Sequence, residues 1–183
     1  GGVTEDASSP DLTDSGTLSF SDLDTTDTHT VSTAYNSDAV WSGGTLTAEQ
    51  IAAVSSGFTA DSDSWDYSLA NSAVQFLAAG ETITLSFDVT VTDDSTSAND
   101  SDTGTVTITI TGNNDAPAVA DAGDVSVDES QTVNNSGTWT DSDANGLVTL
   151  SASVGSVTKN AKGTWNWTFD SNDGPDQSQT VTI

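Results

Sequence analysis

The sequence predicts an all-β protein built from two β-sandwich domains in tandem. Three observations lead to this prediction: runs of alternating apolar and polar residues, turn-forming Gly, Asn and Asp residues between the runs, and a second half that repeats motifs of the first. Alternation with a period of two places one set of side chains on a core and the other in water, as in antiparallel sheets that are buried on one face.

The first half of the chain contains five such runs, predicted as strands at residues 16–20, 29–35, 64–69, 82–91 and 104–112. In the run "TITLSFDVTV" the Ile, Leu, Phe and Val side chains share one face, and the Thr, Ser and Asp side chains share the other. This arrangement is typical of a strand that is half buried and half solvated.

A short helix is expected at residues 48–55, between two of these strands. Thr47 and Gln50 have the spacing of a capping box, in which each side chain bonds to the backbone of the other residue. Ile51 and Val54 then repeat at helical spacing. We therefore predict a helical insertion in an otherwise β-rich domain.

The second half shows the same pattern of alternating runs and turn residues as the first. Its apolar runs are predicted as strands at residues 124–129, 137–141, 147–155, 163–169 and 179–183, with Gly, Asn and Asp turns between them. Many short strands with regular turn signals are typical of β-sandwiches.

The two halves also share motifs. "SGTLSFSDLD" at residues 15–24 matches "SGTWTDSD" at 136–143, and "SWDYSL" at 64–69 matches "TWNWTF" at 164–169, in the same order. We interpret them as two copies of one unit. The predicted boundaries are a first domain at 1–113, a linker at 114–117 and a second, incomplete domain at 118–183.

The charge of the chain restricts its function. It has 28 Asp and Glu against 2 Lys and Arg, for a net charge of −26, which excludes nucleic acid and disfavours anionic membrane surfaces. No apolar run is long enough for a membrane span. With no Cys and one His, nucleophilic triads and zinc sites lack their parts, so we expect no enzyme. Carboxylate oxygens suit Ca²⁺, the predicted cofactor.

The expected linker carries candidate metal ligands. Asn113, Asn114 and Asp115 precede Pro117 and offer amide, carboxylate and backbone oxygens. Calcium takes six to eight such oxygens, so a linker can supply only part of a site. The same residues equally fit a turn in which Asn and Asp bond to their own backbone.

Asp-x-Asp pairs supply further candidates. Asp22 and Asp24 follow a predicted strand of the first copy, and Asp141 and Asp143 follow the matching strand of the second. Asp93 follows the long run at 82–91 and is a further candidate. Two carboxylates beside a chain bend can bind one ion, although a solvated acidic turn is the alternative.

The motifs resemble a known family. "VTED…LTDSGTLSFSDLDTTDTHTVS", "WDYSLANSAVQFLAAGETITLSFDVTVTDDS" and "SDTGTVTITITGNNDAPAV" are similar to the VCBS-type repeat, over nearly all of residues 3–119. Residues 120–183 resemble a related bacterial Ig-like repeat. The resemblance implies immunoglobulin- or cadherin-like sandwiches strung end to end in large RTX-type adhesins. Such proteins are secreted to the bacterial surface, stiffened by calcium, and used in adhesion and biofilms.

The resemblance also implies roles for acidic residues. In cadherin-like repeats an early Glu lies at the pole that faces the next linker, so Glu5, with Asp6 beside it, is expected to join the linker residues and the second Asp-x-Asp pair at one calcium site. Asp22, Asp24 and Asp93 are expected at the opposite pole. The implied partners are neighbouring repeats of the same chain.

A ligand-binding adhesin module is the alternative function. Trp41 lies beside Gly43 and Gly44, and a loop Trp can stack on a sugar ring, although core packing is the commoner use of a Trp. This alternative predicts recognition of a carbohydrate or a protein.

Overall fold

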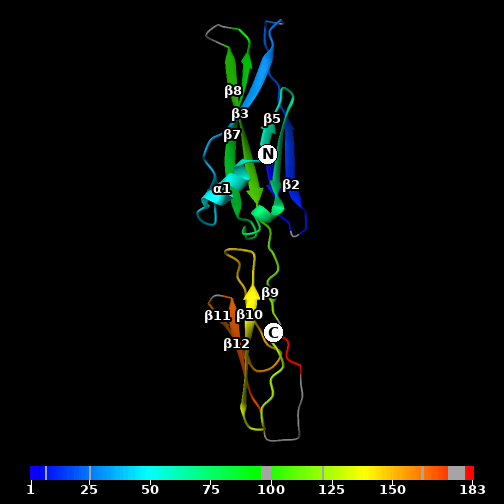
Figure 1. The fold of residues 1–183 in the computed structure, drawn as a ribbon, viewed down its shortest axis with the longest axis vertical. Helices are drawn as coiled ribbons and strands as arrows, with labels where there is room; N and C mark the ends of the chain where they lie inside the picture. Colours follow the sequence, from blue (N-terminus) through cyan, green and yellow to red (C-terminus); the bar gives the residue numbers. More distant parts are fainter. Residues whose placement is uncertain (7, 25, 96–99, 121, 162, 173–179) are drawn as a thin grey trace. The chain divides into compact units, whose positions relative to one another are not determined.

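The computed structural model describes the whole chain except residues 7, 25, 96–99, 121, 162 and 173–179. The chain divides into two compact units (Figure 1): the first comprises Gly1–Asp115 and Asp143–Asn145, and the second comprises Ala116–Ser142 and Gly146–Ile183. Strands dominate both units, as the sequence predicts. Among the described residues, no helix is long and apolar enough to cross a membrane.

The first unit contains two sheets. The larger sheet has the order β1-β8-β7-β3, with β4 also on β7, and the smaller has the order β2-β6-β5. Only β1 pairs in parallel, with β8. The bounds are β1 Gly2–Thr4, β2 Asp11–Thr17, β3 His29–Tyr35, β4 Val40–Trp41, β5 Phe58–Ala60, β6 Ser64–Ala70, β7 Thr82–Asp93 and β8 Ser101–Thr111.

One apolar core joins the two sheets. Alternate residues of β7 and β6 turn toward it, so Leu85 and Tyr67 are each 1% exposed. Phe87 of the larger sheet stacks on Phe58 of the smaller, with ring centroids 4.4 Å apart. The first unit is therefore a pair of face-to-face sheets.

The predicted helix is confirmed as α1, Ala48–Ser55. Thr47 Oγ1 accepts a hydrogen bond from Gln50 N at 3.2 Å, and Gln50 Oε1 accepts one from Thr47 N at 2.8 Å, which completes the capping box. Val54 is fully buried. A 3-10 turn, Asn71–Ala73, also follows β6.

Most strands of the first unit match the predictions, with one shift. The run predicted at 16–20 is a strand only at its start, because β2 begins at Asp11 and ends at Thr17. Leu18 N still donates to Asp63 O at 2.8 Å, but the chain then leaves the sheet. The apolar residues beyond Thr17 are therefore not strand residues.

The described residues of the second unit form a single sheet of order β11-β12-β10-β9. Its strands are β9 Ala118–Val119, β10 Thr132–Thr140, β11 Ser156–Asn160 and β12 Thr164–Asp170. β12 matches the predicted 163–169 closely, and β10 covers most of the predicted 137–141.

Two predicted strands of this unit are wrong. Residues 124–129 and 147–155 form no strand. In the first of these runs Val125 and Val127 are 45% and 44% exposed, so the alternating apolar side chains are not buried. In the run predicted at 179–183, residue 179 lies outside the described residues, and the remaining four form no strand.

The repeated motifs occupy equivalent places in the two units. Gly16 of β2 pairs with Trp65 of β6, and Gly137 of β10 pairs with Trp165 of β12. Two residues after each Trp, an aromatic side chain donates to a valine carbonyl 13 positions upstream: Tyr67 Oη to Val54 O at 2.7 Å, and Trp167 Nε1 to Val154 O at 2.6 Å. This correspondence supports the interpretation of two copies.

Candidate metal-binding sites

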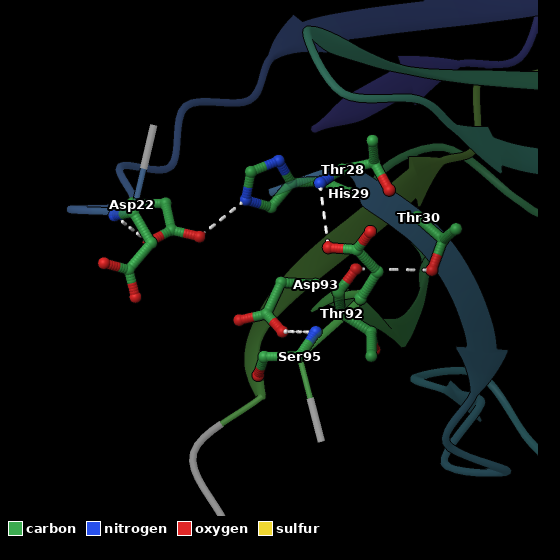
Figure 2. Close-up of polar contacts among 9 residues, drawn as sticks. Asp22, Thr28, His29, Thr30, Thr92, Asp93 and Ser95 are labelled. Carbon is green, nitrogen blue, oxygen red and sulfur yellow. Dashed lines mark hydrogen bonds and ion pairs between the residues drawn. The ribbon is translucent and has the colours of Figure 1, made fainter. Parts of the chain in front are cut away.

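Three aspartates of the first unit converge. Asp22, Asp27 and Asp93 each offer a carboxylate oxygen, and these oxygens lie within 4.8 Å of one another. In the part of the chain that the structure describes, no other group of three or more His, Cys, Asp or Glu side chains meets this criterion. Asp22 and Asp27 belong to the loop between β2 and β3, and Asp93 ends β7. Figure 2 shows Asp22 and Asp93 in this region.

Hydrogen bonds fold the loop onto the end of β7. His29, the first residue of β3, pairs with Asp93 in the sheet. Its Nε2 lies 2.9 Å from Asp22 Oδ2, a contact drawn in Figure 2. Thr28 N donates to Asp94 Oδ1 at 3.1 Å, and Asp24 N donates to Asp22 Oδ1 at 2.9 Å. His29, for which the sequence predicts no role, thus positions Asp22.

The electrostatics of this cluster favour a cation. Desolvation raises the pKa of Asp27, and the charges of the neighbouring carboxylates, led by Asp94 and Asp24, raise it further. The pKa of Asp22 is lowered, first by the backbone N–H of Asp24 and then by His29. Asp22 therefore stays ionised, whereas the charge on Asp27 is disfavoured. A divalent ion would remove this repulsion.

The expected residues are partly present in this cluster. Asp22 and Asp93 take part, but the carboxylate of Asp24 does not belong to the group of three. Asp27 is the member that sequence reasoning missed. Only the register of β3 on β7 reveals it, because Asp27 stands two residues before His29, which pairs with Asp93.

A second set of acidic residues of the first unit lies beside the end of β8, near the predicted linker. Glu5 follows β1 and is 1% exposed. Its Oε2 accepts a hydrogen bond from Asn113 N at 3.0 Å, and its Oε1 accepts one from Gln75 Nε2. Glu5 N donates to Thr111 O at 2.8 Å, so the β1–β8 pairing places Glu5 beside the predicted linker. Sequence reasoning missed Gln75.

Asp115 and Asp143 meet within this unit. Asp115 N donates to Asp143 Oδ2 at 3.2 Å, and Asp143 is 6% exposed. Ala144 N donates to Phe76 O at 3.0 Å and fixes the segment that carries Asp143. Asp115 Oδ2 is buried and accepts no hydrogen bond from any residue that the structure describes. A buried carboxylate oxygen without a donor is costly unless a cation binds it.

Glu5, Asp115 and Asp143 do not form a compact group of carboxylates. Their carboxylate oxygens do not all lie within 4.8 Å of one another, as those of Asp22, Asp27 and Asp93 do. A calcium ion here would need backbone, amide or water oxygens to complete its shell. Among the two sets, the first is the more concentrated, and the second contains the more deeply buried acids.

Three other predicted ligands, Asp6, Asn114 and Asp141, belong to neither of these two sets. The Asp6 carboxylate accepts from Ser8 N, Ser9 N and Ser9 Oγ at 2.7, 2.6 and 2.6 Å. Asn114 Nδ2 donates to Asp115 O at 2.8 Å, as in an ordinary turn. Asp141 belongs to the second unit.

Trp41 is engaged with its own unit. Its Nε1 donates to Glu81 Oε2 at 3.1 Å, and its ring meets Phe76 edge-on with centroids 5.0 Å apart. The indole is half-buried against the core. This packing gives no support to a sugar platform at Trp41.

No protein-family model and no curated protein matches the sequence. Among solved structures, the chain is similar to a chimeric titin Z1Z2-Z1Z2 tandem functionalized with a GRGDS exogenous peptide from fibronectin. The match has 10% identity, covers 93% of this chain and 82% of that one, and has a TM-score of 0.23. A TM-score this low carries no argument about fold or function.

Proposed function

We propose that this chain is a pair of calcium-stiffened, immunoglobulin- or cadherin-like extender domains from a large secreted bacterial adhesin. The observation that carries the calcium part is the convergence of Asp22, Asp27 and Asp93 within 4.8 Å, from a loop and a strand end that are far apart in sequence. The adhesin part rests on the resemblance of residues 3–119 to VCBS-type repeats.

Calcium suits the first cluster for a chemical reason. It takes six to eight oxygens at about 2.3–2.6 Å, and three carboxylates with backbone and water oxygens satisfy that demand. Desolvation and then the charges of neighbouring carboxylates raise the pKa of Asp27, and a bound cation would offset those charges. The chain, with a net charge of −26, has few cations of its own to do so.

The second set supports a separate calcium site. Asp115 Oδ2 is buried without a hydrogen-bond donor, and Glu5 and Asp143 are buried acids of the same unit. Glu5 Oε1 and Oε2 already accept hydrogen bonds, from Gln75 and Asn113, so calcium would be expected to bind first at Asp115 Oδ2.

The proposed role is mechanical rather than catalytic. Repeats of this kind would lock when they reach a calcium-rich exterior and project a distal binding domain from the cell surface, in adhesion and biofilm formation. Neighbouring repeats of the same chain are the proposed partners. The high negative charge would keep the unfolded chain soluble before export.

Calorimetry and thermal melting of the whole chain test the proposal. With millimolar Ca²⁺ we expect a melting temperature many degrees above that in chelator, because calcium binds the folded state. Asp27→Asn should remove one binding event, Asp115→Asn a different one, and the exposed Asp66→Asn neither. Superimposable melting curves with calcium and with chelator would rule out the calcium function.

Scattering of the same samples tests the stiffening. Calcium should reduce the flexibility of the two-unit chain, and the Asp115→Asn variant should lose this effect. If the calcium-bound chain were as flexible as the chain in chelator, the protein would bind calcium without being stiffened by it, and the extender role would be wrong.

A further inference from the structure

An apolar groove of about 210 Å³ opens in the first unit, and none of the acidic residues of the two sets lines it. Its apolar lining comes from Leu18 and Phe20 beyond the end of β2, and from Val89 and Val91 of β7. β8 forms another wall with residues 102–106. The groove therefore lies where the smaller sheet has ended and the larger sheet continues.

A missing side chain opens this groove. Along β8, Val106, Ile108 and Ile110 share the face turned toward the core, and Gly104 is next on that face. Gly104 pairs with Val89, and a Cβ built on it would meet no atom within 4 Å. The apolar stripe of β8 is therefore interrupted at the one position that would have filled the hollow.

Two carboxylates border the apolar floor. Asp61 Oδ1 accepts from Asp63 N and Ser64 N at 2.9 and 2.7 Å, which lowers the pKa of Asp61 and keeps it ionised. Asp102 Oδ1 accepts from Thr103 N at 2.9 Å. Asp61 and Asp102 both line the groove. A ligand that complements this site carries positive charge beside an apolar group.

The size of the groove narrows the choice of ligand. Sites for whole small molecules commonly measure about 300–1,000 Å³, so 210 Å³ suits a single large side chain better. A second copy of this chain is disfavoured, because two chains of charge −26 repel. We propose that the groove binds a basic segment of a partner protein, with one aromatic side chain against Gly104 and Lys or Arg facing Asp61 and Asp102.

Peptide binding to the whole chain tests this proposal. The probe is fluorescein-labelled KTKFKTK, and the matched control peptide is KTKSKTK, which has the same charge and no anchor. Anisotropy is measured at 150 mM salt, with calcium and with chelator, so that any calcium site is assessed separately. We expect the Phe peptide to bind about ten-fold tighter than the Ser peptide, because only it buries an aromatic ring.

Variants locate the binding. Gly104→Leu fills the hollow and should reduce the Phe peptide to the affinity of the Ser peptide, while Gly123→Leu, at another glycine with open space, should change nothing. Asp102→Asn should weaken both peptides without removing the preference for Phe. A TTTFTTT peptide should bind poorly.

Several results would overturn the proposal. Equal binding of the Phe and Ser peptides would mean general attraction to an acidic surface. An unchanged Phe preference in Gly104→Leu, or unchanged affinity of both peptides for Asp102→Asn, would place the contact elsewhere. Tight binding of the TTTFTTT peptide would indicate an apolar site with no need for a basic partner.

Discussion

The indole ring of Trp65 lies directly over Gly16, its cross-strand partner, and leaves no room for a side chain there. A Cβ built on Gly16 would come closer than 3.0 Å to three ring atoms of Trp65. Gly137 and Trp165 repeat this contact in the second unit, also with three ring atoms closer than 3.0 Å. The glycine in each "SGT" motif is thus required by the tryptophan opposite.

Gly16→Val and Gly137→Val should each destabilise the unit that carries them. The added methyl groups must displace a buried indole, and overpacking of this kind costs about 1–3 kcal/mol. Urea unfolding followed by amide NMR reports each unit separately. Gly104→Ala, where a Cβ meets open space, is the control and should change the free energy of unfolding little.

Tyr67→Phe should destabilise the first unit by about 1–3 kcal/mol, because it leaves the Val54 carbonyl without its buried donor. Tyr35→Phe is the matched control, since Tyr35 is only half-buried and its hydroxyl accepts from Ala39 N. Chemical denaturation measures both. An equal loss in the two variants would contradict a special role for the Tyr67 bond.

The same residue predicts an alkaline effect. Burial raises the pKa of Tyr67, so the folded state favours its neutral form. Its contribution to stability is present below the ordinary value of about 10 and is lost as the pH rises above it. Ultraviolet titration should therefore show one tyrosine that ionises only when the first unit unfolds.

Asp27→Asn should have opposite effects with and without calcium. In chelator at pH 7 it removes a disfavoured charge and should raise the melting temperature; with saturating calcium it removes a ligand and should shrink the calcium-induced gain. The pKa of Asp27 is raised, so its charge destabilises the fold only as the pH rises above the ordinary 3.8. The variant and the native chain should therefore converge near pH 3.

Asp66→Asn, which removes an exposed charge from β6, is the control for this experiment. If Asp27→Asn lowered the melting temperature in chelator, repulsion among these aspartates would not be what destabilises the fold.

Asp6 should stabilise the fold against acid. Hydrogen bonds from the Ser9 side chain and from the Ser9 and Ser8 backbones lower the pKa of Asp6 from 3.8 to about 2. Its stabilising effect is full above 3.8 and is lost as the pH falls toward 2. Carboxyl carbon NMR should show this low midpoint, and Ser9→Ala should move it back toward the ordinary value. An Asp6 midpoint near 3.8 in the native chain would show that these bonds do not persist in solution.

The sequence predicts best where a local signal and burial agree. The helix 48–55 and the strand 29–35 have the predicted bounds, the helix because its capping box is formed by residues three apart. Residues 124–129 show the same alternation as a true strand, yet Val125 and Val127 remain exposed. Alternation of apolar and polar residues shows which side chains a strand could bury. Whether they are buried depends on the presence of a partner strand.

The candidate sites show the same limit. Asp22 and Asp93 were expected together because each follows a predicted strand and the resemblance to cadherin-like repeats places both at one pole. Asp27 needed the register of β3 on β7, which pairs His29 with Asp93 and cannot be counted off the sequence. The buried state of Glu5 likewise depends on the parallel placement of β1 beside β8.

That parallel pair also determines how the first unit would respond to pulling. β1 opens the unit and β8 precedes its last residues, and Gly2, Val3 and Thr4 lie opposite Thr109, Ile110 and Thr111. Tension applied between Gly1 and Asp115 would draw these strands past each other along their length. Their hydrogen bonds would then be loaded together in shear instead of opening one after another. Such an arrangement slows forced unfolding, which is governed by the unfolding rate.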